Sequence, residues 1–230
     1  MAVRTSPADG HPLPDWVRTR EGSDPGTVHL IVVDPGAVTP EAARQCCTQL
    51  ARLGYRHALT NAMAPDDADV LVAAGFTVRE SLDLLGRSLA GVPARGTRTN
   101  RPANLRSVVA LDARAFGDRA FDRAALRDAL DATRTARIRV AGPRSVPLGY
   151  AITGVAGPRA YLQRLAVDPT ARRRGIARAL VADGLRWARR RRATTVLVNT
   201  HQDNDAARAL YESAGFVLLP RGLHVLERTL

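Results

Sequence analysis

The segment that decides the fold runs from Tyr161 to Phe216. It begins with Leu162-Gln163-Arg164-Leu165-Ala166-Val167-Asp168-Pro169, an apolar run closed by proline, which predicts a strand. Next comes Arg172-Arg173-Arg174-Gly175-Ile176-Ala177, which leads into a long amphipathic helical pattern. A second strand-like run covers 194–199, and the segment closes with Asn204 and Ala209-Leu210-Tyr211-Glu212-Ser213-Ala214-Gly215-Phe216. We expect the rest of the chain to complete the sheet of this segment or to lie beside it.

The glycine loop at the start of the predicted helix is a candidate anion site. The first N–H groups of a helix have no partner within it, and Gly175 lets a ligand approach the backbone without meeting a side chain. Arg172–Arg174 add positive charge, so the arrangement suits a pyrophosphate with a further phosphate nearby. The loop composition alone fits a solvated charged turn equally well. The later run Arg189–Arg192 is interpreted as a solvated helix end, where cations favour the dipole.

Composition limits the function classes. The chain has 230 residues, enough for one large domain or two small ones, and a formal net charge of +12. All 34 basic residues are arginine, so the chain has no lysine side chain of its own to acylate. The charge predicts anionic partners and disfavours a polycationic substrate. A nucleic-acid partner is disfavoured, because the aromatic residues that stack on bases make up only 4% of the chain.

The two cysteines and the apolar runs give further expectations. Cys46 and Cys47 are adjacent, so they form neither a disulfide framework nor a metal set, and we expect no metal. Cys46 shares a helix face with Leu50 and Leu53, which predicts that the cysteines are core residues. No apolar run has the length of a signal-peptide core or a membrane span. We therefore expect a cytoplasmic protein, monomeric or homodimeric, with no membrane partner.

The sequence before the deciding segment predicts strands and helices on both sides of a linker. Residues 1–25 are rich in proline and glycine and predict a flexible tail, with Trp16 and Val17 against the body. Thr39 suits a helix N-cap and Pro40 the first helical position. The predicted strands are 28–33, 58–60, 82–89, 138–140 and 148–152, the predicted helices are 40–53, 65–74, 105–116 and 124–130, and the linker is 91–103.

Two parts of the chain repeat one another. Val33-Asp34-Pro35 matches Val167-Asp168-Pro169, Ala74-Gly75-Phe76 matches Ala214-Gly215-Phe216, and the strand 82–89 matches 223–230 in pattern. Strand, helix, strand, helix, strand therefore occurs twice. The first copy has no arginine and glycine loop, and it has Ala64 in place of Asn204 and Leu71 in place of Tyr211. We interpret the first copy as structural and expect one active site in the chain.

The loop and the closing segment resemble the acyl-CoA-binding core of the GNAT superfamily of N-acetyltransferases. The family loop is Gln or Arg, two variable residues, Gly, one variable residue, then Gly or Ala, and it stands here as Arg172-Arg173-Arg174-Gly175-Ile176-Ala177. The later family motif stands as Asn204, Ala207, Leu210-Tyr211-Glu212 and Gly215-Phe216. The resemblance covers roughly 104–230 and extends weakly to 28–89. The chain is thus similar to a tandem GNAT protein with one competent half.

The resemblance implies a fold and a domain division. The fold is α/β (α+β), with a mixed, mostly antiparallel central sheet flanked by helices and a smaller duplicated half-GNAT domain. The implied division is a flexible N-terminal tail at 1–25, a degenerate partial GNAT-like domain at 26–90, a linker at 91–103 and a catalytic GNAT domain at 104–230.

The resemblance also implies acetyl-CoA as the cofactor. In the family the fourth and fifth strands splay apart and pantetheine lies between them. Here the strand residues Leu165, Ala166 and Val167 would bind pantetheine, and the Val167 N–H could polarise the thioester carbonyl. The N–H groups of the loop would hold the pyrophosphate, and Asn204 would bind the cofactor through its side chain. The loop residues are Arg172, Arg173, Arg174, Gly175, Ile176 and Ala177.

The implied reaction is direct attack of a neutral amine on the thioester. Tyr211 would protonate the leaving thiolate, because a phenol with a pKa of about 10 suits that role; a core tyrosine with a satisfied hydroxyl is the alternative. The ribosomal-protein alanine acetyltransferases of the family, which this half resembles, place a glutamate where Asn199 stands. Asparagine can order a water but cannot act as a base. His201 has a suitable side chain, or is an exposed loop histidine, and the base is unassigned.

In the family the acceptor enters beside the loop between the first two helices. That loop is Phe116-Gly117-Asp118-Arg119-Ala120-Phe121, and its candidate substrate-binding residues are Phe116, Asp118 and Phe121. Two aromatic residues with mixed charge suit a peptide end or a small amine. Our first hypothesis is an acetyl-CoA-dependent N-acetyltransferase acting on a primary amine of a protein N-terminus or a small molecule. The alternative is a non-catalytic acyl-CoA sensor, which the missing glutamate favours and Tyr211 disfavours.

Overall fold

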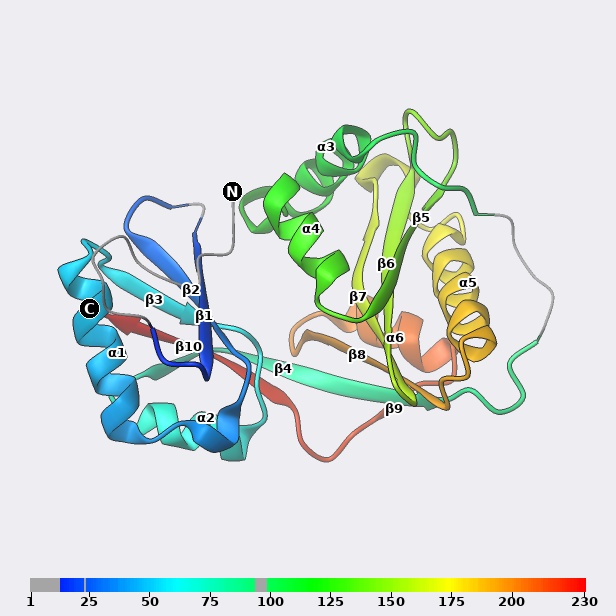
Figure 1. Ribbon diagram of the computed structural model, residues 1–230. Coiled ribbons are helices and arrows are strands. Elements are labelled where there is room, and N and C mark those ends of the chain that lie inside the picture. Colours follow the sequence, from blue (N-terminus) through cyan, green and yellow to red (C-terminus); the bar gives the residue numbers. More distant parts are fainter. Residues whose placement is uncertain (1–12, 23, 94–98) are drawn as a thin grey trace. The chain divides into compact units, whose positions relative to one another are not determined.

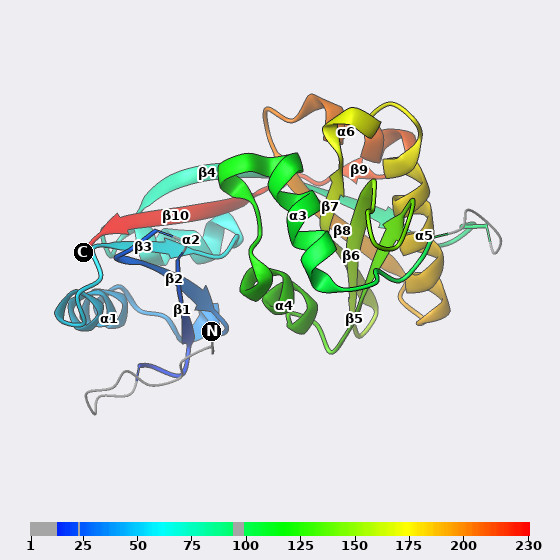
Figure 2. The same cartoon turned by 90° about the horizontal axis from the view of Figure 1, so that it is seen from above.

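The computed structural model describes residues 13–22, 24–93 and 99–230. The contacts within the chain divide these residues into two compact units. The first unit comprises the described residues up to Leu84 together with His201–Asp203 and Pro220–Leu230. The second comprises the described residues of Leu85–Thr200 and of Asn204–Leu219. Figures 1 and 2 show the helices and strands of both units from two sides.

The first unit contains a mixed sheet. Its strand order is β1-β2-β3-β10-β4, where β4 contributes its first part. The strands are β1 Val17–Glu21, β2 Thr27–Val32, β3 His57–Thr60, β10 Leu223–Thr229 and β4 Thr77–Ser88. The pair β2–β3 is parallel, whereas β1–β2, β3–β10 and β10–β4 are antiparallel. In β2 buried and partly buried residues alternate, as expected for a sheet with one covered face.

Two helices supply the core of this unit. They are α1 Pro40–Arg52 and α2 Pro65–Val72, and the short 3-10 helix η1 Pro35–Ala37 precedes α1. Buried residues of α1, including Cys46 and Leu50, pack in one cluster with Leu30 of β2 and Leu226 of β10. The cysteines are therefore core residues, as predicted, and burial raises the pKa of the Cys46 thiol to about 12.

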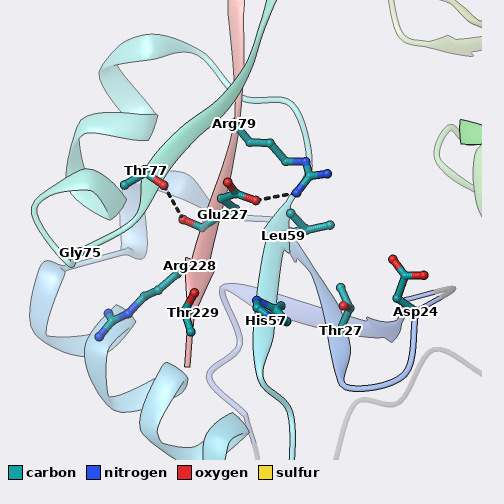
Figure 3. A pocket seen from close by; sticks show the side chains of 10 residues that line it. All are labelled: Asp24, Thr27, His57, Leu59, Gly75, Thr77, Arg79, Glu227, Arg228 and Thr229. Atoms are coloured by element: carbon teal, nitrogen blue, oxygen red, sulfur yellow. Dashed lines mark hydrogen bonds and ion pairs between the residues drawn. The ribbon is translucent and has the colours of Figure 1, made fainter. Parts of the chain in front are cut away.

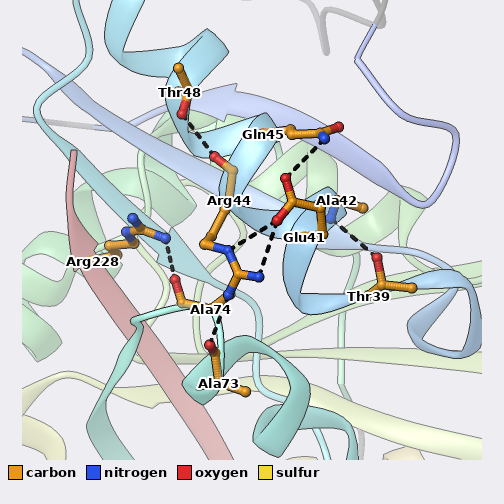
Figure 4. Close-up of polar contacts among 9 residues, drawn as sticks. All are labelled: Thr39, Glu41, Ala42, Arg44, Gln45, Thr48, Ala73, Ala74 and Arg228. Carbon is orange, nitrogen blue, oxygen red and sulfur yellow. Dashed lines mark hydrogen bonds and ion pairs between the residues drawn. The ribbon is translucent and has the colours of Figure 1, made fainter.

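The start of α1 is closed by its own side chains (Figure 4). Thr39 is the N-cap, and its Oγ1 accepts a hydrogen bond from the Ala42 N–H at 3.1 Å. Pro40 occupies the first turn and has no N–H to satisfy. The Glu41 carboxylate accepts from Arg44, whose Nη1 also donates to the Ala73 carbonyl at 3.2 Å and so connects α1 to the end of α2. The predicted cap is confirmed.

The second unit contains a sheet with the order β4-β8-β7-β6-β5, in which β4 contributes its last part and β9 pairs with β4. The additional strands are β5 Thr135–Ala141, β6 Gly149–Ala156, β7 Arg159–Val167, β8 Thr195–His201 and β9 Val217–Leu218. The pairs β5–β6, β6–β7 and β4–β9 are antiparallel, and β7–β8 is parallel. Every residue of β6 except Ala156 is buried, because helices cover both faces of the sheet.

The helices of the second unit lie in two layers. On one face Val108 and Leu111 of α3 and Leu126 of α4 pack against Tyr150 and Ile152 of β6. On the other face α5 and α6 pack in a separate cluster with residues of β7 and β8. The helices are α3 Leu105–Phe116, η2 Gly117–Arg119, α4 Arg123–Asp131, η3 Pro169–Ala171, α5 Ile176–Arg190 and α6 Asp205–Ser213.

The last strands of the two sequence copies are exchanged. The first copy runs β2-α1-β3-α2-β4 and the second β7-α5-β8-α6-β10, as the repeat predicts. In the first unit, however, the neighbour of β3 is β10, which ends the second copy. In the second unit the neighbour of β8 is β4, which ends the first copy. Each unit is therefore completed by a strand that the other copy contributes.

Two features differ from the expected elements. The region expected to be a tail contains β1, which pairs with β2 along its whole length, because Val17 and Thr19 turn inward beside Trp16. Strand β4 begins at Thr77 instead of residue 82, because Thr77–Leu82 pair with β10.

Residues 1–12 of the predicted tail and 94–98 of the predicted linker lie outside the described residues. The structure adds that Pro220–Leu230 group with the first unit. The division into a degenerate partial domain at 26–90 and a catalytic domain at 104–230 stays a prediction.

Candidate active site

The parallel strands β7 and β8 pair only at their beginnings. The described ladder joins Arg159 to Thr195, Ala160 to Val196 and Tyr161 to Leu197. Beyond these positions β7 continues to Val167 and β8 to His201. Among the residues that the structure describes, the two strands thus have no further ladder positions over their second halves. We call this stretch without ladder positions the gap; the backbone groups of β7 on this side of the strand are available to a ligand there.

The hydrogen bonds on the other edge of β7 show which residues face this gap. Gly149 of β6 lies opposite Val167, and the Asp168 N–H donates to the Leu148 carbonyl at 2.9 Å. In an antiparallel ladder this makes Gly149–Val167 a pair that exchanges no hydrogen bonds, and such pairs alternate with bonded ones. The backbone groups of Val167 and Leu165 therefore point toward the β8 side. Ala166 points toward β6, so its backbone is used within the sheet.

The start of α5 is open, in contrast to the capped start of α1. Its N-cap is Gly175, in the left-handed region with φ of 76°, and no side chain caps the helix. A Cβ placed on Gly175 would have no heavy atom within 4 Å, so the space beside this residue is open. Arg172, Arg173 and Arg174 are exposed beside it, and the first turn contains no acidic residue. Unpaired N–H groups, positive charge and free space fit a phosphate or pyrophosphate.

Two residues to which the sequence analysis assigned no role in the site hold this loop in place. A Cβ on Gly149 would come within 2.6 Å of Ile176, so only glycine lets the first turn of α5 lie this close to β6. Asp168 accepts from the Thr170 Oγ1–H at 2.7 Å and from Arg114 of α3 at 2.8 Å. The Thr170 hydroxyl, then Arg114, lower the pKa of Asp168 to about 2. The Asp-Pro pair gave a signal for a turn, but its arginine partner is distant in sequence.

Tyr211 lies on the buried face of α6. Its side chain is 5% exposed and belongs to the apolar cluster that includes Leu162 of β7 and Val198 of β8. Its ring centroid is 5.6 Å from that of Phe216. Burial raises the pKa of Tyr211 to about 12. In the part of the chain that the structure describes, we find no hydrogen bond between its hydroxyl group and the protein.

The remaining predicted residues of this region have different environments. Asn204 is the N-cap of α6, where its Oδ1 accepts from the Ala207 N–H at 3.1 Å, so its amide NH2 group is not used by this contact. Asn199 is exposed on β8, past the last ladder position. His201 Nδ1 lies 3.6 Å from Asp203 Oδ2, and both residues group with the first unit. The structure therefore brings Leu165, Val167, the α5 loop, Asn204 and Tyr211 into one unit but does not place His201 with them.

The predicted acceptor loop surrounds an arginine of β7. The guanidinium carbon of Arg164 lies 3.6 Å from the ring centroid of Phe116 and 3.8 Å from that of Phe121. Asp118 is exposed in η2, between the two aromatic residues. The two rings thus contact a side chain of the protein itself. No local sequence pattern indicates this contact, because Arg164 lies more than forty residues away along the chain.

A recess on the first unit is a separate feature (Figure 3). It has a volume of about 610 Å³ and is lined by side chains of β3, β4 and β10 among others. Its Arg79 Nη1 pairs with Glu227 Oε2 at 2.5 Å, and Thr77 Oγ1 donates to the Glu227 carbonyl at 3.4 Å. It does not contain the open helix start or the tyrosine described above. We assign it no part in acyl transfer.

Two kinds of feature are absent from the described ranges, 13–22, 24–93 and 99–230. No group of three or more His, Cys, Asp or Glu residues there could hold a metal ion. None of the helices within these ranges has the length and apolar character needed to cross a bilayer.

Comparison with known proteins identifies the domain that carries this site. Residues 112–216 match the Acetyltransferase (GNAT) family. This matched range contains β7, the open start of α5, Asn204 and Tyr211. The predicted family is confirmed.

Individual relatives add detail. Over 67 residues the chain is 40% identical to the [ribosomal protein bS18]-alanine N-acetyltransferase of Escherichia coli (strain K12), a match that covers 29% of this chain and 45% of that protein. The chain thus spans less than half of the curated relatives it matches. A tandem GNAT protein from the clavulanic acid biosynthesis pathway has a TM-score of 0.65 at 16% identity, covering 93% of this chain and 78% of that one. A GCN5-related N-acetyltransferase from Kribbella flavida has a TM-score of 0.60 at 17% identity, covering 92% and 86%.

These two structures agree with the predicted fold class. At 16% and 17% identity, the similarity to these structures shows the fold alone. The structural match covers 93% and 92% of this chain. The mixed, mostly antiparallel sheet flanked by helices is confirmed, and so is its tandem organisation.

Proposed function

We propose that the protein is an N-acetyltransferase that moves an acetyl group from acetyl-CoA to a primary amine by direct attack of the amine on the thioester. The acceptor is a protein or peptide N-terminus or a small molecule, and the peptide is supported by the relative named for acetylating a ribosomal protein. The proposal includes the cytoplasmic location and the monomeric or homodimeric state expected from the sequence.

One observation carries the proposal: the gap after Tyr161 and Leu197 lies in the same unit as the open start of α5. The gap offers backbone groups of Leu165 and Val167, which suit the amide groups of pantetheine. The helix start offers N–H groups and arginines, which suit a pyrophosphate. An extended thiol cofactor with a phosphate-rich end needs both kinds of site.

Each residue then has a proposed task. The N–H groups of Arg172–Ala177 hold the pyrophosphate, and the unused amide group of Asn204 binds the cofactor. The backbone of Leu165 and Val167 holds pantetheine, and the Val167 N–H polarises the thioester carbonyl. Acetyl-CoA supplies an activated acyl group with a good leaving thiolate. The backbone of Ala166 points toward β6, so we propose no hydrogen bond from it to the cofactor. Its proposed part is its position in the strand between Leu165 and Val167.

Tyr211 is proposed as the acid. Since burial raises its pKa to about 12, the phenol stays protonated at neutral pH. A group this weakly acidic stabilises a developing thiolate mainly by donating a hydrogen bond, and the proton moves as negative charge grows on sulfur. Among the described residues, none accepts a hydrogen bond from the Tyr211 hydroxyl. This agrees with a hydroxyl that is available to donate to a ligand.

The attacking amine must also lose a proton. We propose that Asn199, exposed beyond the last ladder position of β8, orders a water that relays this proton. His201 is the proposed alternative, as a base in its own right. Substitution of each residue by alanine separates them: the one whose loss lowers kcat with the amine while CoA affinity is retained is the relay.

A free-thiol release assay with acetyl-CoA across a panel of amines and N-terminal peptides tests the function. We expect turnover with at least one amine and a fall in kcat of about 100-fold for Tyr211→Phe, with CoA affinity retained. Tyr161→Phe, which changes a tyrosine of β7 outside the proposed site, is the matched control and should keep activity. CoA binding without turnover for any amine or acyl-CoA would reject the enzyme and favour the acyl-CoA sensor.

A further inference from the structure

The loop between α3 and α4 is attached to β7 by a buried ion pair. Asp112 of α3 is fully buried, with 0% exposure. Its carboxylate accepts from Arg164 Nε at 3.1 Å and from Arg164 Nη2 at 2.7 Å. The Tyr150 hydroxyl donates to Asp112 Oδ1 at 2.6 Å. Two strands and a helix therefore meet at one carboxylate, which is held by a forked guanidinium.

The loop itself is bound to the same pair. Arg164 Nη2 also donates to the Arg119 carbonyl at 2.9 Å, and the Phe121 N–H donates to Asp112 Oδ2. The rings of Phe116 and Phe121 stack on the guanidinium from 3.6 Å and 3.8 Å. Gly117, with φ of 58°, lets the chain leave α3 and turn around the arginine. The loop 116–121 thus makes its aromatic and polar contacts with Asp112 and Arg164.

The placement of Arg164 gives this arrangement a consequence for the reaction. Arg164 directly precedes Leu165, whose backbone faces the gap between β7 and β8. A loop that is fixed to Arg164 is fixed relative to the strand that would hold the thioester. Reacting groups must be placed to within a fraction of an ångström, and a misplacement of about 1 Å can cost about 100-fold in rate.

We propose that Arg164, held by Asp112 and by Phe116 and Phe121, is a positioning residue that sets the acceptor loop against the thioester strand and thereby determines how well the amine substrate binds. This inference rests on the proposed function, because it assigns the loop 116–121 to the acceptor. Buried ion pairs contribute little net stability compared with apolar residues of similar size, so the pair gains its value from the geometry it fixes. Phe116 and Phe121 act on the acceptor through the position of the loop.

The chain offers a matched control for this pair. Arg137 of β5 pairs with Asp183 of α5 at 2.5 Å and lies 4.8 Å from the ring centroid of Trp187. Its side chain is 14% exposed, the same value as for Arg164, whose ion-pair distance is 2.7 Å. Arg137 is therefore an arginine of equal side-chain exposure with an aspartate partner and an aromatic neighbour, but it has no contact with the loop 116–121 in the described structure.

The test compares Arg164→Lys with Arg137→Lys. Lysine keeps the charge but loses the forked hydrogen bonds and the stacking. For Arg164→Lys we expect kcat/KM for the amine to fall by about 10- to 100-fold through KM, with the acetyl-CoA KM within about twofold of wild type. Hydrogen exchange of the 116–121 amides, Phe121 above all, should accelerate. Arg137→Lys should lower the melting temperature by a similar amount and change neither readout.

Further outcomes decide the inference. Equal effects of both substitutions on the amine KM, or equal losses for both substrates, would overturn the positioning role in favour of general destabilisation. If Arg164→Lys fails to fold, Phe121→Leu removes one stacked ring with little change in volume and should give the same KM change at smaller size. If the wild-type protein acetylates no amine, the proposed function is wrong. Unchanged exchange of the 116–121 amides in Arg164→Lys would then reject the attachment of the loop as well.

Discussion

The helices α1 and α5 occupy the same place in the two copies, yet they begin in opposite ways. At the start of α1, Thr39 caps the helix, Pro40 removes a donor and Glu41 adds negative charge. At the start of α5, Gly175 leaves the first N–H groups uncapped, no acidic residue is present, and three arginines precede the helix. One helix end is satisfied by its own side chains, whereas the other can bind an anion.

The parallel strand pairs that flank these helices in the sequence differ in the same sense. In the first unit the ladder runs from Thr27–His57 to Leu30–Thr60, and the Asn61 N–H continues it with a bond of 3.0 Å to the Leu30 carbonyl. Asn61 Oδ1 then accepts from the Val32 N–H at 2.8 Å, which holds the ends of β2 and β3 together. In the second unit the ladder stops at Tyr161–Leu197. The same pattern of elements therefore gives a closed strand pair in one copy and an open one in the other.

The comparison explains why we place a single site in this chain. The core pattern of strands and helices survives in both copies, since burial of apolar faces requires only the right periodicity. The proposed ligand site depends instead on unsatisfied backbone groups, and a few side chains can satisfy such groups. Thr39 and Asn61 do so in the first unit.

The largest effect should come from removing the exchanged strand. A chain that ends at Leu219 loses β10, which lies between β3 and β4 and carries the fully buried Leu226. We expect the first unit to lose its cooperative structure. Hydrogen exchange followed by mass spectrometry should show loss of protection in β2 and β3, and a synthetic peptide of residues 220–230 should restore it. Unchanged protection in β2 and β3 would show that the first unit folds without β10.

The next largest effect should come from closing the open helix start. Gly175→Asp adds a negative charge at the N-terminus of α5 and places a Cβ at a φ of 76°. We expect CoA affinity, measured by calorimetry, to fall by about 10- to 100-fold. Thr39→Asp puts the same carboxylate at the start of α1 and should leave the affinity unchanged. Equal affinities of the Gly175→Asp variant and the wild type would show that phosphate binds elsewhere.

A smaller effect should come from opening the closed strand pair. Asn61→Ala removes the acceptor of the Val32 N–H, so the free energy of unfolding should fall by about 1 kcal/mol in a denaturant titration. Asn61→Asp keeps an acceptor oxygen and should retain most of the stability. CoA affinity should not change in either variant. A change in CoA affinity would contradict the assignment of the site to the second unit alone.

The smallest effect should appear in acid. The pKa of Asp168 is lowered to about 2, so its ionised form contributes stability that is present above the ordinary aspartate pKa of 3.8 and is lost as the pH falls toward 2. Asp168→Asn should therefore flatten the loss of stability over this pH range. Asp34 stands at the equivalent position of the first copy and makes no capping hydrogen bond, so Asp34→Asn is the control. Identical acid unfolding of the two variants would contradict the role of Asp168.

Local sequence was enough for the helices and for the glycine at the uncapped start of α5. The bounds of α3 match the predicted 105–116, and Thr39 and Asn204 cap helices as single residues with nearby partners. Strand ends were predicted less well, because pairing decides them: β4 starts five residues earlier than expected, and β1 was not expected as a strand. The roles proposed for Tyr211, Asn199 and His201 stay predictions.

The sequence by itself determined the glycine loop, the repeat and the family resemblance, because each depends on residues that are neighbours along the chain. Only the tertiary structure decided three other features. These are the exchange of β4 and β10, the end of the ladder at Tyr161–Leu197, and the enclosure of Arg164 by Asp112, Phe116 and Phe121. Each of these depends on hydrogen bonds or packing between segments far apart in the chain, and no local pattern specifies which distant edge or side chain will be the partner.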